Sequence, residues 1–143
     1  MDVTVWVDDW QMQCCGEPFR RGARVSWTLR APDQESLSNL LGEEAAATID
    51  AAEEHHGDVA EDTEPTSGTV KSIRAVHGRY AKASSESQTW HVVPRSGVLT
   101  ELESADGWTA NRGELRFVGY LVRLSTRREP APGRPLVLSP EVR

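Results

Sequence analysis

The sequence has no apolar run that approaches the ~18 residues required for a membrane-spanning helix. Hydrophobic residues make up 38% and charged residues 27% of its 143 positions, as in ordinary globular chains. We therefore expect no membrane partner. The length is the commonest one for a single domain, so two separately folding domains are not expected either.

Cysteine is nearly absent. The only two, Cys14 and Cys15, are adjacent, and the Cβ vectors of neighbours diverge, so a disulfide between them would be strained. We expect no disulfide framework and a fold held by its core in a reducing compartment. The N-terminal residues also lack the basic and continuous apolar regions of a secretory signal, which predicts a cytoplasmic location.

Positive charge is absent from one long segment. Residues 33–64 contain eleven carboxylates and neither Lys nor Arg, although the whole chain has a formal net charge of only -6. Residues 65–143 carry twelve basic and seven acidic side chains. We expect residues 33–67 to form an acidic helix and loop insert, mostly solvated, because like charges resist burial. Because residues 65–143 carry more basic than acidic side chains, the sequence is still compatible with an anionic partner.

Apolar alternation predicts six strands, at 3–7, 25–29, 69–80, 89–93, 98–102 and 115–124, of which the first two are expected to pair. The spacing of three between Val70, Ile73 and Val76 predicts a bulge or a twist. In the last strand, alternation places Val118, Tyr120, Val122 and Leu124 on one face.

One helix is predicted after Asp33, a suitable N-cap, and before Gly42. Its apolar residues Leu37, Leu40 and Leu41 follow helical spacing. Residues 43–56 fit either helix or strand. The predicted fold class is α+β and mainly β, with about six antiparallel strands in a partly closed barrel or strongly twisted sheet and one or two short helices.

The predicted globular domain spans residues 1–124. Within it, residues 57–67 are expected to form a mobile loop, because they contain too few apolar residues to pack. Residues 125–143 are expected to form a C-terminal tail or docked arm, with prolines at 130, 132, 135 and 140.

Three strings carry a family resemblance. The N-terminal string runs from Val5 to Phe19 and is followed by Gly22, Val25 and Trp27; the others are residues 68–76 and 118–122. Together they resemble a family of small uncharacterised proteins from actinobacteria such as Streptomyces, known only as a domain of unknown function. The resemblance implies no activity.

Catalytic signatures are also lacking. The sequence contains no phosphate-binding loop, dinucleotide fingerprint, zinc-protease motif or nucleophile elbow. We therefore assign no catalytic residue and no cofactor, and favour a non-catalytic cytoplasmic binding or interaction module. A protein or a small ligand is the favoured partner, and exposed sheet edges also allow a homodimer.

The candidate binding residues are of three kinds: uncommon aromatics, the vicinal cysteines and arginines of the basic strand after Gly68. They are Trp10, Cys14, Cys15, Arg74, Arg79, Tyr80, Trp90 and Trp108. For each tryptophan, the default interpretation is a place in the core. Cations interleaved with rings also suit single-stranded nucleic acid, which is one alternative partner.

The other alternative is a small metal- or thiol-dependent enzyme. Cys14 or Cys15 together with His77 and His91 offers sulfur and imidazole ligands for zinc, or a thiolate with a histidine base. The spacing argues against zinc, because adjacent strand residues point to opposite faces.

Overall fold

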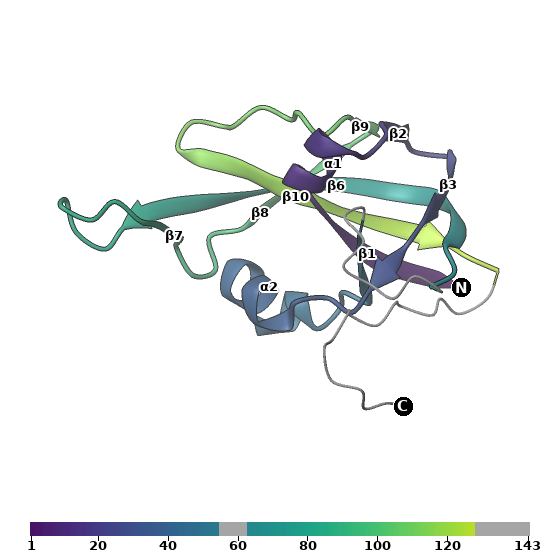
Figure 1. Cartoon of the computed structure of the whole chain (residues 1–143), viewed down its shortest axis with the longest axis horizontal. Helices are drawn as coiled ribbons and strands as arrows, with labels where there is room; N and C mark the ends of the chain where they lie inside the picture. Colours follow the sequence, from purple (N-terminus) through teal and green to yellow (C-terminus); the bar gives the residue numbers. More distant parts are fainter. Residues whose placement is uncertain (55–62, 128–143) are drawn as a thin grey trace.

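The computed structural model describes residues 1–54 and 63–127. Its two longest strands are β6 (Thr66–Lys82) and β10 (Leu115–Ser125), which run side by side through the molecule (Figure 1). The other strands of the main sheet are β1 (Asp2–Asp8), β3 (Arg24–Trp27), β4 (Leu29–Arg30), β5 (Ala51–Glu53), β7 (Trp90–Val92) and β8 (Val98–Leu102). A separate pair consists of β2 (Phe19–Arg20) and β9 (Ser104–Ala105). The helices are α1 (Asp9–Cys14), α2 (Gln34–Leu41) and α3 (Glu43–Ala46).

The main sheet curls into a nearly closed barrel. Its strand order is β3-β6-β10-β1-β5-β4, and the two end strands β3 and β4 follow each other in sequence, separated only by Thr28. The seam of the barrel therefore lies between β3 and β4. The expectation of a mainly β, partly closed barrel is confirmed.

Strand alternation divides the core into two clusters. Val5 and Val7 of β1 point into the barrel with Tyr120 and Val122 of β10, whereas Trp6 points outward. The outer cluster joins the sheet to the helices, with Trp6, Leu37, Leu40, Ala46, Ile49, Ala52, Val76 and Leu121 as its buried members. Helix α1 closes one end of the barrel by contributing Met12 to the inner cluster. α1 and α2 accordingly lie on opposite sides of the long strands (Figure 1).

Two register shifts explain where simple alternation fails. Leu124 pairs with Val70 while Arg123 pairs with Ser72, so Lys71 is the extra residue of a bulge in β6, as the apolar spacing predicts. A second shift lies between Phe117 and Gly119 of β10. Val118 consequently packs with the outer cluster rather than with Tyr120, which corrects the predicted face.

Five of the six predicted strands and the helix after Asp33 are present. The strand predicted at 25–29 is divided at Thr28 into β3 and β4, which lie at opposite ends of the sheet order. The Asp33 side chain accepts a hydrogen bond from the Ser36 backbone N–H at 3.2 Å, and α2 ends at Leu41 with Gly42, whose φ is 94°, as its C-cap. The expected pairing of the first two strands is wrong, because β1 pairs with β10 and with β5, and the β1–β5 pairing is parallel. Residues 43–54 contain both a helix, α3, and a strand, β5.

The acidic segment is less solvated than its composition indicates. Glu53 and Glu54 are only 1% and 5% exposed, because β5 inserts between β1 and β4. Most of the predicted mobile loop (57–62) and most of the predicted tail (128–143) lie outside the described residues. No helix in the described part of the chain is long and apolar enough to cross a membrane.

Candidate ligand-binding groove

A groove of about 720 Å³ lies where the β1–α1 junction, α2 and the β6–β7 hairpin meet. The hairpin extends beyond the barrel (Figure 1). Residues of the hairpin line one part of the groove, and residues of α2 line another. Its lining residues are Trp6, Asp8, Asp9, Trp10, Arg30, Asp33, Ser36, Leu37, Asn39, Leu40, Tyr80, Trp90, His91, Val92, Arg116, Phe117 and Val118. The volume is in the range of small-molecule sites.

Aromatic side chains form much of the groove surface. Trp10 is 48% exposed and Trp90 is 53% exposed, and Tyr80 is half-buried in the same groove. The expectation that these tryptophans belong to the core is therefore wrong. Exposed tryptophans that share a concave surface are the pattern of a recognition site, since flat rings provide contact area at low entropic cost.

Two of these rings already interact with cations of the chain. The Lys82 ammonium lies 5.2 Å from the centroid of the Trp90 ring, and the Arg116 guanidinium lies 5.3 Å from that of Tyr80. Both separations are within the range of cation–π attraction. The ring faces are thus oriented where a positive charge can reach them.

A hydrogen-bonded polar cluster fixes the base of the groove. Trp6 Nε1 donates to Asp8 Oδ1 at 2.8 Å, and Arg30 Nε donates to Glu54 Oε1 at 2.8 Å. Arg30 also contacts Asp8 Oδ2 at 3.5 Å, and Gln11 Nε2 donates to Glu54 Oε1 at 3.2 Å. The buried Glu54 carboxylate is thus paired and hydrogen-bonded, as burial of a charge requires.

Burial raises the pKa of both carboxyl groups at the β1–α1 junction. For Asp8, desolvation outweighs the hydrogen bond from Trp6 and the charge of Arg30. For Asp9, desolvation outweighs the backbone hydrogen bond from Trp10, and the charge of Asp8 adds to the increase. Desolvation and the charge of Asp9 also raise the pKa of Tyr80. A positive group entering the groove would favour the ionised carboxylates.

Beneath this cluster, burial raises the pKa of Glu53 to about 8, with the charges of Glu54 and Asp8 adding to the effect and Arg30 opposing it. Alternation along β5 directs Glu53 to the same side as Ala51, which belongs to the inner cluster. Glu53 therefore belongs to the barrel interior rather than to the surface of the groove, which it does not line.

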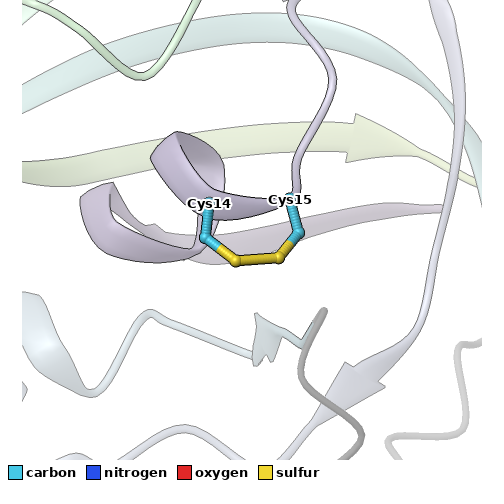
Figure 2. The surroundings of a disulfide bond; sticks show 2 residues. All are labelled: Cys14 and Cys15. Carbon is cyan, nitrogen blue, oxygen red and sulfur yellow. A yellow bond between two sulfur atoms is a disulfide. The ribbon is translucent and has the colours of Figure 1, made fainter.

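The vicinal cysteines form a disulfide, Cys14–Cys15, at the C-terminal end of α1 (Figure 2). The divergence of neighbouring Cβ vectors argued against this bond, and the structure corrects that argument, although a bond between neighbours staples no distant parts of the chain. Both residues are exposed and neither lines the groove. A disulfide supplies neither a thiolate nucleophile nor a thiolate metal ligand, so the enzyme alternative requires prior reduction.

The two histidines of the proposed metal site lie in different surroundings. His77 is buried in the barrel, with Nε2 2.9 Å from the Ala110 carbonyl oxygen, whereas His91 is exposed on β7 and lines the groove. Within residues 1–54 and 63–127, no group of three or more His, Cys, Asp or Glu is placed to hold a metal ion.

The remaining candidates are scattered. Arg74 and Arg79 lie on opposite faces of β6 by alternation, and Arg79 Nη1 contacts Glu114 Oε2 at 2.9 Å. Neither arginine lines the groove, and neither does Trp108, which is 66% exposed. The structure thus brings together Trp10, Tyr80 and Trp90 from the predicted set.

Sequence reasoning missed the charged residues of the groove, namely Asp8, Asp9, Arg30, Asp33 and Arg116. One signal was available, since two consecutive carboxylates directly follow the most regular strand and precede Trp10. Arg30 and Arg116 gave no such signal, because a single arginine beside a strand is ordinary.

The comparisons with known proteins identify a family and no activity. The model of a family described as a family of unknown function (DUF6578) matches residues 1–126. No curated protein and no solved structure matches the chain.

Proposed function

Because the chain belongs to this family of unknown function, no activity is inherited from relatives, and we propose from the groove that the protein is a non-catalytic binding module. The observation that carries the proposal is the presence of two half-exposed tryptophans, Trp10 and Trp90, on one groove of about 720 Å³. Exposing large rings to water is unfavourable unless a partner covers them.

The groove suits a small ligand better than a flat protein surface. It is concave, and its aromatic walls lie beside a few polar groups, among which Asp8 and Arg30 are held by hydrogen bonds and by their ion pair. Small-molecule sites combine these features: apolar walls for affinity and a few fixed polar groups for orientation.

A fragment library screened by ligand-observed NMR tests the proposal. We expect hits whose signals weaken in Trp10→Ala and Trp90→Ala but persist in Trp108→Ala, a matched control because Trp108 is exposed outside the groove. Hits that are indifferent to Trp10 and Trp90 would contradict the site. Reproducible turnover of any compound in a metabolite screen would contradict a non-catalytic role.

Single-stranded nucleic acid is the second candidate, supported by the cations that lie over Trp90 and Tyr80. The carboxylates of Asp8, Asp9 and Asp33 in the same groove oppose a phosphate backbone, so we rank it lower. Filter binding of an oligonucleotide across a salt series tests it, because phosphate contacts weaken with salt. No retention at low salt would end this alternative.

A further inference from the structure

The groove combines ring faces with an excess of carboxylates. Of the residues that line it, Asp8, Asp9 and Asp33 are acidic and Arg30 and Arg116 are basic. Arg30 is already shared between Asp8 and Glu54, and Arg116 lies over Tyr80. Of these partners, Asp8 belongs to the groove itself, so the lining as a whole holds one more carboxylate than arginine and is negative by that one charge.

We infer that the groove binds an organic cation, with a planar amidinium or guanidinium group placed between the aromatic walls at Trp10 and Trp90 and the carboxylates at Asp8 and Asp9. This inference rests on the proposed function and adds the chemical class of the ligand. Rings and carboxylates attract the same partner, because the negative face of a ring and a carboxylate both stabilise positive charge. The chain's own Lys82 and Arg116 show that the Trp90 and Tyr80 rings accept cations.

The ionisation of the groove supports the same ligand class. Burial raises the pKa of both Asp8 and Asp9, and the charge of Asp33 adds to the effect at Asp8. A bound cation would stabilise the ionised carboxylates of Asp8 and Asp9, whereas a bound anion would destabilise them further. The site therefore discriminates by charge as well as by shape.

Three probes of nearly the same shape test the inference at neutral pH: benzamidine, benzamide and benzoate, which are cationic, neutral and anionic. Titration calorimetry and ligand-observed NMR should show that benzamidine binds at least about tenfold more tightly than benzamide, the size of effect expected of a charge-assisted hydrogen bond. We expect no binding of benzoate, and weaker binding of benzamidine as salt increases.

Variants locate the binding. Asp9→Asn keeps the shape of the side chain and removes its charge. We expect it to lower the affinity for benzamidine about tenfold and to leave the affinity for benzamide unchanged. Asp9 is the better choice, because Asp8 is tied to Trp6 and Arg30 and its replacement would disturb the base of the groove. Trp90→Ala should lower the affinity for benzamidine, and the control variant Trp108→Ala should leave it unchanged.

The possible failures are distinguishable. Equal binding of benzamidine and benzamide at the groove, or preferential binding of benzoate, would overturn the cation class and leave the binding module standing. Binding of benzamidine that is insensitive to Asp9→Asn would also overturn it. Absence of binding by all three probes, alongside groove-dependent hits from the fragment library, would overturn the cation class alone.

Discussion

At the scale of single residues, Gly119 shows how close the strands approach behind the groove. A Cβ at this position would lie 2.6 Å from the Val7 carbonyl oxygen and 2.7 Å from Trp6 Cζ2. No real side chain tolerates such contacts, and the backbone of Val7 cannot yield easily because β1 pairs with β10 there. Gly119 is therefore required for the position of Trp6 and, through it, of Asp8.

Gly119→Ala should lower the free energy of unfolding by about 1–3 kcal/mol, the usual cost of overpacking a core. Gly78→Ala is the comparison, because a Cβ there would meet Leu40 Cδ1 at 2.8 Å, which is the far end of a flexible side chain. Denaturant unfolding of both variants measures the difference. Equal costs at the two glycines would refute the argument from backbone contact.

At the scale of elements, the long strands were predictable and the short elements were not. β1 and most of β10 carry apolar alternation, and β6 carries recurring apolar residues whose spacing of three marks its bulge, so sequence reasoning detects all three. α1 has only six residues and is helical because Met12 closes the end of the barrel, a tertiary cause without a local signal. β5 has three residues between two neighbouring strands, so its existence depends on pairing rather than propensity.

The groove was predictable only in its aromatic part. Trp10, Tyr80 and Trp90 attract attention because large rings are uncommon, but their convergence depends on where β1 ends and on the projecting β6–β7 hairpin. Arg30 reaches the same place from the end of β4, and Asp33 does so from the N-cap position of α2. Contacts between residues so distant in sequence result from the closure of the barrel. The spacing of residues along the chain predicts single strands and helices but not this closure.

The disulfide belongs to α1 and is expected to stabilise the fold little. It closes the shortest possible loop, between neighbours, so it removes little entropy from the unfolded chain. Reduction, or the double variant Cys14→Ser with Cys15→Ser, should change the free energy of unfolding by about 1 kcal/mol or less. Denaturant melts with and without reductant measure this change.

A thiol assay of the native protein is the companion measurement for this disulfide. We expect no reactive thiol before reduction and two afterwards, because both cysteines are exposed. Two reactive thiols in the untreated protein, or a loss of several kcal/mol on reduction, would contradict this account of α1.

At the scale of the whole molecule, closing the barrel buries Glu53 and makes stability depend on pH. Its pKa is raised from 4.5 to about 8 in the folded chain, so between these values the folded state binds more protons than the unfolded state. This contribution to stability is complete below about pH 4.5 and is lost as the pH rises through 8. The slope attributable to Glu53 is at most about 1.4 kcal/mol per pH unit.

Glu53→Gln should remove this slope, because a neutral amide has no proton to lose in this range, and the variant should gain stability relative to the parent as the pH rises from 5 to 8. Denaturant unfolding at several pH values measures the effect, and Glu103→Gln, at an exposed position, is the control. Parallel pH profiles for the parent and Glu53→Gln would show that the buried carboxyl does not govern stability. A stability difference between Glu53→Gln and the parent that grows as the pH rises from 5 to 8 would assign this pH dependence to the buried Glu53 carboxyl.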